Sequence, residues 1–228
     1  MKGIVFTEFL ELVEERYGLE VVDKIIYQSK LESQGIYTSI GTYSFSEMLQ
    51  LLENLRDHTG ISIDNLLLIY GEHFFSVIET SYKDLLSAYN DPIEMLSSIE
   101  HHIHIEVRKI YQDAELPTFL VIEKTNNSLI MIYKSSRSMH HFGLGLMNKT
   151  FEYFNSKAYI LLEKIKDDPK MFLIGGLILL VYGLITYLDK SQKRAIQDET
   201  LVLTEKSNYT KLFIKGFLLN FIKNQNTH

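Results

Sequence analysis

The sequence predicts an α+β fold, because helical patterns fill the first half of the chain and strand patterns follow them. Up to about position 115, apolar residues recur at helical spacing. The β-rich runs at 118–124 and 128–134 flank an Asn-containing turn, which is typical of a β-hairpin. The apolar runs at 158–165 and 170–174 predict a second hairpin. Since helices and strands are segregated along the chain, an antiparallel sheet is expected rather than alternating βαβ units.

The N-terminal helices are expected from their caps and stop signals. The first carries apolar residues over 6–13 and is expected to end at Gly18. Another begins at Ser44, which stands three residues before Glu47 in the capping-box pattern. A further, strongly apolar helix is expected over 62–78.

Two more helices complete the pattern. Asp91 is expected to cap a helix that continues to Tyr111, with Pro92 at its first position. After the first hairpin, residues 139–154 return to a helical pattern.

The composition bounds the classes of function. The chain of 228 residues is 46% hydrophobic, enough for one domain with an appendage or for two small domains. Its net charge of −6 argues against a nucleic-acid binder. The absence of cysteine excludes disulfides, cysteine zinc sites and thiolate ligation of haem. Acidic residues interrupt the N-terminal apolar window, so no signal peptide is expected and this part should fold in the cytoplasm.

An uncharged stretch lies at 171–188, about long enough to cross a bilayer core of roughly 30 Å. It predicts a membrane-spanning or membrane-associated helix. Lysines and Arg194 flank it on both sides, so the charges indicate no orientation. The alternative is a buried strand at 171–174 followed by a short core helix. Residues 212–222 are too short to span a membrane and fit an interfacial or partner-facing amphipathic helix.

Three histidines stand together in the run at 101–104. On a helical wheel, His102 and His104 fall at opposite edges of an apolar face, and His101 points to the polar side. The neighbours on the wheel favour His104 for an interior position. Such a histidine is commonly a core-edge residue with one satisfied hydrogen bond, but it can also be an axial ligand of a b-type haem. The apolar face consists of Leu96, Ile103, Val107 and Ile110.

The sequence IYKSSR places Tyr133, Ser135 and Arg137 at alternate positions. On a strand, their side chains would leave the same face and present a phenol, a hydroxyl and a guanidinium with no acid to pair with them. The exposed face of an antiparallel strand is the ordinary explanation. Together with a buried histidine, however, these donors suit the two propionates of a haem.

The residues 103–119, followed by YKSSR at 133–137, resemble the haem-nitric oxide/oxygen-binding (H-NOX) family. This is the family of the soluble guanylate cyclase sensor domain and of bacterial nitric oxide sensors. The opening residues, MKGIVF, match as well. The resemblance implies an N-terminal helical subdomain and a C-terminal subdomain with an antiparallel sheet and helices around a buried haem b. It also implies a sensor domain over 1–174 and a C-terminal extension over 175–228, which carries an extra hydrophobic helix.

The resemblance assigns a role to each candidate site residue. It makes His104 the proximal ligand of the haem iron, and Pro117 the proline that presses on the haem and distorts it. The family's Tyr-x-Ser-x-Arg motif, which binds the propionates, is complete in this chain. Gln112 departs from the proline that many members have there, in a loop where haem binding is not affected. The motif residues are Tyr133, Ser135 and Arg137.

The distal positions predict which gas binds. Members that hold dioxygen donate a hydrogen bond to it from a distal Tyr, and that position falls on Phe142 here, which cannot donate. We therefore expect the ferrous haem to bind nitric oxide and carbon monoxide and to exclude dioxygen. A shift of one residue in the alignment would instead place His141 near the gas. The distal pocket is expected to consist of Val5, Phe9, Phe142 and Leu146.

The resemblance implies a sensor and not an enzyme. Nitric oxide would break the bond between iron and His104, leaving a five-coordinate nitrosyl haem that relaxes against Pro117, and the helices would shift. No nucleotide-binding or catalytic motif is present, so the output should pass to a partner such as a histidine kinase or a diguanylate cyclase. The tail would tether this cytoplasmic sensor to the inner membrane. The alternatives are a dioxygen or redox sensor and a membrane-anchored adaptor whose sensor domain has lost its haem.

Overall fold

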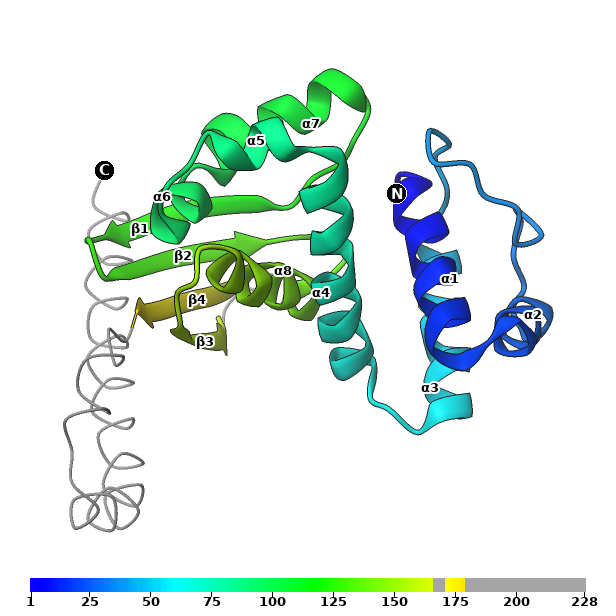
Figure 1. Ribbon diagram of the computed structural model, residues 1–228. Coiled ribbons are helices and arrows are strands. Elements are labelled where there is room, and N and C mark those ends of the chain that lie inside the picture. Colours follow the sequence, from blue (N-terminus) through cyan, green and yellow to red (C-terminus); the bar gives the residue numbers. More distant parts are fainter. Residues whose placement is uncertain (166–170, 179–228) are drawn as a thin grey trace, which may run out of the picture. The chain divides into compact units, whose positions relative to one another are not determined.

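The computed structural model describes residues 1–165 and 171–178, and these residues form the predicted α+β fold (Figure 1). Four helices make up the N-terminal part, and α1, α3 and α4 bury their apolar faces in one common core. The segregation of helices and strands is therefore confirmed. The four helices are α1 (Ile4–Tyr17), α2 (Leu19–Gln28), α3 (Phe45–Thr59) and α4 (Ile63–Ser81).

The expected boundaries of α1 and α3 hold, with one difference in the cap. Gly18 ends α1, and Ser44 caps α3 by accepting a hydrogen bond from the Ser46 amide at 3.2 Å. The carboxylate of Glu47 does not complete a capping box. It is buried and accepts hydrogen bonds from the hydroxyls of Ser33 and Tyr37, the latter at 2.7 Å.

The single helix expected from Asp91 to Tyr111 is wrong, because it is divided by a π-helical turn. Asp91 caps as predicted, accepting from the Glu94 amide at 2.9 Å. A π turn contains more residues than a turn of an α-helix. A helical wheel drawn with about 100° per residue therefore gives wrong directions for the side chains that follow the π turn. As a consequence, Ile110 is exposed rather than part of an apolar face. The segments are α6 (Pro92–Ser97), η1 (Ile99–Ile103) and α7 (His104–Ile110), preceded by the short α5 (Lys83–Ser87).

Both predicted hairpins form and join into one antiparallel sheet. The strand order is β1-β2-β4-β3, so β4 lies in the middle and pairs with both β2 and β3. Helix α8 (His140–Tyr153) connects the two hairpins. The strands are β1 (Thr118–Lys124), β2 (Ser128–Lys134), β3 (Ala158–Lys164) and β4 (Met171–Ile178).

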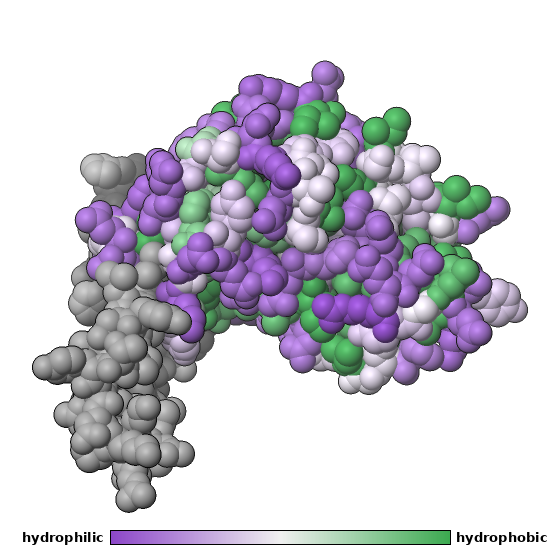
Figure 2. All heavy atoms as spheres, viewed as in Figure 1, coloured by the Kyte–Doolittle hydropathy of each residue, from purple (hydrophilic) through white to green (hydrophobic). Residues whose placement is uncertain are grey.

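Helices α4 and α8 pack closely, and two glycines permit the contact (Figure 1). A Cβ atom on Gly71 would lie 2.1 Å from the carbonyl oxygen of Phe142, and one on Gly145 would lie 2.2 Å from that of Leu68. Because both obstacles are backbone atoms, larger residues would push the two helices apart. On the face drawn in Figure 2, hydrophobic residues form small patches among hydrophilic ones, as expected when most apolar side chains are packed inside.

The apolar stretch at 171–188 begins as a strand. Residues Met171–Ile178 form β4, so a membrane helix over the whole stretch is wrong for this part, and the strand extends beyond the boundary expected at 174. The rest of the stretch and the predicted helix at 212–222 lie outside the described residues. Among the described residues, no single helix has the length and apolarity to cross a membrane. Only the pair α3 and α4 meets these criteria together, with a bend of 109° between them.

Candidate functional site

His104 is the buried histidine of the 101–104 run, with 7% of its surface exposed. It is the first residue of α7 and directly follows the π turn. His101 is exposed, and His102 bonds through Nδ1 to the hydroxyl of Tyr89 at 2.5 Å. The helical wheel favoured His104 over His102 for the interior only slightly, whereas the structure buries His104 more deeply than the other two histidines.

A single carboxylate oxygen orients the His104 ring. Nδ1 of His104 lies 3.1 Å from Oε1 of Glu100, and the same oxygen accepts the amide of Phe119 at 2.7 Å. Because Nδ1 donates to the carboxylate, the proton is held on that nitrogen and Nε2 keeps its lone pair. Burial lowers the pKa of His104 from its ordinary value, although the Glu100 carboxylate acts in the opposite direction. The ring is therefore suited to binding a metal through Nε2.

Phe119, on β1, lies between His104 and Tyr133, the first residue of the donor triplet, on β2. Its ring centroid is 5.9 Å from that of His104 and 5.3 Å from that of Tyr133. The histidine and the triplet are thus two aromatic contacts apart, although they are far apart in sequence. The sequence did not single out Phe119 or Glu100, because neither has a motif of its own.

The triplet does not lie along one strand face as expected. Strand β2 ends at Lys134, so only Tyr133 is on the strand, and Ser135 and Arg137 follow in a turn. The turn nevertheless gathers them, since the Arg137 amide donates to Oγ of Ser135 at 3.1 Å. Burial raises the pKa of Tyr133, and this is partly offset by its hydrogen bond with Ser135 and by the charge of Arg137. Tyr133 therefore stays a neutral phenol beside a hydroxyl and a cation.

Arg137 has an acidic partner that the sequence did not reveal. Its guanidinium donates to the carbonyl oxygen of Glu115 at 2.7 Å and pairs with the Glu115 carboxylate. The Arg137 side chain is only 16% exposed, whereas that of Glu115 is 80% exposed. The acid therefore reaches in from the surface, and another carboxylate could take its place on the guanidinium. Pro117, two residues after Glu115, is half-buried directly before β1.

The expected distal residues pack with aromatic side chains of the N-terminal core. The Phe142 ring lies 5.0 Å from that of Tyr70 and 5.5 Å from that of Phe74. Val5 and Phe9 belong to the same core, whereas Leu146 packs in a neighbouring cluster.

Tyr70 adds a polar group among these residues that the sequence did not indicate. Its buried hydroxyl donates to the carbonyl oxygen of Val5 at 2.5 Å. The only hydrogen of this hydroxyl is therefore already used. His141, the other residue weighed for this position, lies 3.2 Å from Asp64 and so takes part in a different contact.

A pocket of about 340 Å³ lies beside Glu100, between the α6–η1 segment and β1. Phe119 lines it, whereas His104 and Tyr133 do not. The donor set fits a haem by its chemistry: one neutral imidazole with a fixed tautomer, and a phenol, a hydroxyl and a guanidinium for two carboxylates.

Comparisons with known proteins identify the family. The model of a family described as Haem-NO-binding matches residues 2–161. The crystal structure of the Fe(II) unliganded H-NOX protein from K. algicida is 72% identical, with a TM-score of 0.76 over 78% of this chain and 96% of that one. A mutant of that protein is 70% identical, with a TM-score of 0.78 over 81% and 100%.

More distant relatives extend the likeness. An H-NOX protein from S. oneidensis in the Fe(II)NO ligation state shares the fold, with 21% identity and a TM-score of 0.72 over 78% of this chain and 99% of that one. The soluble guanylate cyclase gcy-35 of Caenorhabditis elegans is 26% identical over 141 residues, which are 60% of this chain. The matched part is 20% of that cyclase, so this chain corresponds to a fraction of its length.

Proposed function

Because the chain belongs to the haem-NO-binding (H-NOX) family, a family of haem-based gas sensors, we propose that it senses nitric oxide and signals to a partner protein. The observation that carries the proposal is the placement of His104. It is buried, its Nδ1 is bonded to Glu100, and Phe119 contacts both its ring and that of Tyr133. A histidine that served only as a core-edge residue would need no donor triplet nearby.

The residues that would hold a haem b come from separate elements. His104 would bind the iron through Nε2. The propionates would be bound by Tyr133, Ser135 and Arg137. A propionate would replace the Glu115 carboxylate on the guanidinium of Arg137. Pro117, half-buried before β1, would press against the ring, as the family resemblance implies. The charge-assisted contact of Arg137 is expected to be the strongest of the three donors.

A ferrous haem held by His104 would supply the iron that binds nitric oxide and a bond to His104 that responds to the gas. The chain would do the rest. Glu100 holds the imidazole to η1 and, through the Phe119 amide, to β1. A change in the position of His104 would therefore pass to the π turn and to the sheet. A ligand that favours one of two arrangements of these elements is the minimum needed for signalling.

The distal residues support nitric oxide over dioxygen. Phe142 offers no hydrogen-bond donor, and the hydroxyl of Tyr70 donates to Val5. Bound dioxygen carries partial negative charge and would find no partner, whereas nitric oxide needs none.

The output and the location are also proposals. A partner such as a histidine kinase or a diguanylate cyclase would read the changed arrangement, since the sequence has no nucleotide-binding motif. The apolar residues after β4 would hold the sensor at the inner membrane, on the cytoplasmic side.

An absorption spectrum of the purified full chain tests the proposal. We expect a ferrous haem band that moves on addition of nitric oxide and does not change in air. Absence of a haem band would support the haem-free adaptor, and a stable spectrum of the oxygen complex would support the dioxygen sensor.

A substitution tests the ligand assignment in the same assay. His104→Gly should lose the haem or retain it only with added imidazole, and the exposed His101→Gly is the matched control. Full haem content and an unchanged band in His104→Gly would rule out His104 as the ligand.

A further inference from the structure

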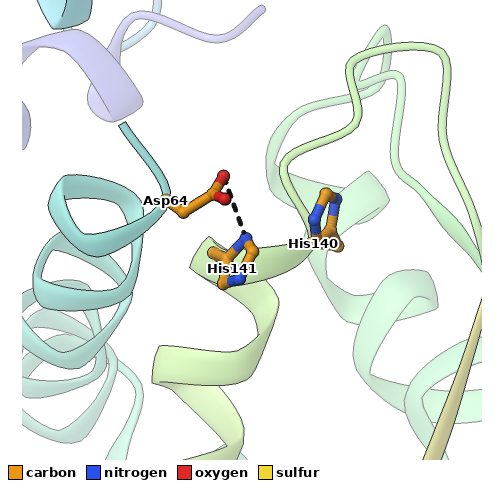
Figure 3. A group of neighbouring side chains, drawn as sticks. All are labelled: Asp64, His140 and His141. Atoms are coloured by element: carbon orange, nitrogen blue, oxygen red, sulfur yellow. Dashed lines mark ion pairs between the residues drawn. The ribbon is translucent and has the colours of Figure 1, made fainter. Parts of the chain in front are cut away.

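Three side chains to which the proposed haem site assigns no role meet where α4 and α8 begin. Asp64 is in the first turn of α4, and His140 and His141 are the first two residues of α8. Figure 3 shows Asp64 directed toward His141, with the ring of His140 beside it. Nδ1 of His141 lies 3.2 Å from Oδ1 of Asp64, and the two imidazole centroids are 4.5 Å apart. One ligand atom from each residue lies within 4.8 Å of the other two.

The local structure does not require this cluster. Ser62 already caps α4 by accepting from the Asn65 amide at 3.3 Å, so the Asp64 carboxylate is not needed as a cap. Nδ1 of His141 is buried and makes no well-directed hydrogen bond within the described part of the chain, despite its short distance to Asp64. A buried polar nitrogen in this condition is costly. A metal ion would bind such a nitrogen through its lone pair.

The ligand types indicate which metal would bind. Two imidazoles and one carboxylate suit Zn²⁺ and similar transition metals, whereas Mg²⁺ and Ca²⁺ prefer oxygen alone. Burial lowers the pKa of His140 from its ordinary value, although Asp64 acts in the opposite direction, and a lower pKa favours the neutral form that binds a metal. Three protein ligands would leave a further position for water.

Rotation of the side chains can bring the three ligand atoms to the spacing that a zinc ion requires. Ligand atoms about 2.0–2.1 Å from a tetrahedral zinc lie roughly 3.4 Å from one another. The contact between His141 and Asp64 is already near that value, and the widest separation of 4.8 Å must shorten. The Asp64 side chain is 63% exposed, which leaves it room to turn. The positive ends of α4 and α8 oppose a cation only weakly beside the energy of zinc coordination.

We propose that Asp64, His140 and His141 form a binding site for a divalent transition metal such as Zn²⁺, which links the beginning of α4 to the beginning of α8. The ion would join the two helices whose backbones touch at Gly71 and Gly145. It would lie beside Phe142, the residue that follows His141 in α8. The site shares no residue with the proposed haem ligand or with the donors for the propionates.

Calorimetric titration of the full haem-loaded chain with zinc chloride tests the proposal. We expect one zinc ion per chain and a higher thermal unfolding midpoint when zinc is present. Asp64→Asn, His140→Gln and His141→Gln should each weaken binding by at least the 10–100-fold or so that loss of an outer-shell partner costs. The control is His101→Gln, which removes an exposed histidine from η1 and should bind zinc like the original chain.

Three outcomes would overturn the proposal. The first is no zinc uptake by the original chain. The second is that all three site variants take up as much zinc as the original chain. The third is that His101→Gln loses as much zinc binding as the site variants. If the cluster is only an ion pair, Asp64→Asn will lower stability without zinc, and zinc will not change the midpoint of the original chain. Asp64 is exposed, so its variant should keep the fold, which circular dichroism and the haem band verify.

Discussion

The imidazole of His104 and the carboxylate of Glu100 form a contact of 3.1 Å between Nδ1 and Oε1, one helical turn apart. The same oxygen accepts the amide of Phe119, so one carboxylate links η1, α7 and β1. A charged acceptor on Nδ1 fixes the tautomer of the ring and makes Nε2 a stronger ligand. Glu100 is therefore a positioning residue for the proposed iron ligand.

Glu100→Ala should leave both N–H donors without this acceptor. We expect the free energy of unfolding to fall by about 1–3 kcal/mol, the usual cost of unsatisfied buried polar groups. Glu100→Gln keeps an acceptor oxygen and should cost less. In the haem-loaded chain, both variants should lower the iron–histidine stretching frequency, which resonance Raman measures, because Nε2 becomes a weaker ligand.

The matched control for Glu100 is Glu106→Ala, which removes a more exposed acid paired with Lys109. Such a surface pair contributes about 0–1 kcal/mol, so little change is expected. Equal Raman frequencies in the original chain and in Glu100→Ala would show that this carboxylate does not act on the ligand.

Arg137→Ala should weaken haem retention more than Ser135→Ala. Hydrogen bonds to charged groups are worth about 1.5–3 kcal/mol and neutral ones about 0.5–1.5 kcal/mol, so we expect the arginine variant to lose haem faster. Transfer of haem to an excess of apomyoglobin measures the rate. Glu115→Gln removes the competing carboxylate and should retain haem at least as well as the original chain. Equal rates in all three variants would assign the triplet to an ordinary surface role.

Phe142→Tyr should let the ferrous protein hold dioxygen, because it adds a hydroxyl donor at the predicted distal position. The measurement is the spectrum in air, compared with that of the unchanged Phe142 protein. Tyr70→Phe is the control: its hydroxyl donates to Val5, so its loss should cost about 0.5–1.5 kcal/mol of stability and leave dioxygen excluded. If Tyr70→Phe alone changes the response to dioxygen, Tyr70 and not Phe142 governs the distal site.

The sequence predicted the elements better than their ends. Both hairpins followed from β-rich runs with turn residues between them, and Asp91 and Ser44 cap their helices as expected. The end of β2 could not be predicted, because it depends on pairing with distant strands, and Arg137 therefore lies in a turn.

The site was predictable where a motif exists and not where only packing decides. The π turn before His104 changes the direction in which the following side chains point. A helical wheel, which assumes the same angle between all consecutive residues, cannot predict this change. Glu100, Glu115 and Tyr70 became visible only through their contacts, since each is an ordinary residue in a helix or a loop. The roles of His104, Phe142 and the triplet stay predictions until the spectra are recorded.

Strand β4 makes the proposed membrane tether testable by two truncations. Ending the chain after Ile178 keeps all of β4, whereas ending it after Ile174 removes residues that pair with both β2 and β3. We expect the longer version to keep its haem and to stay in solution without detergent. The shorter version should unfold at lower temperature, because the middle of the sheet loses its hydrogen bonds.

The full chain provides the comparison for the tether. If residues after β4 enter the membrane, the full chain should sediment with membranes and require detergent, whereas the version ending at Ile178 should not. Both would then show the same haem spectrum, since the proposed ligands all precede β3. Equal solubility of the two without detergent would exclude an anchor in this segment and leave a partner-facing role for it.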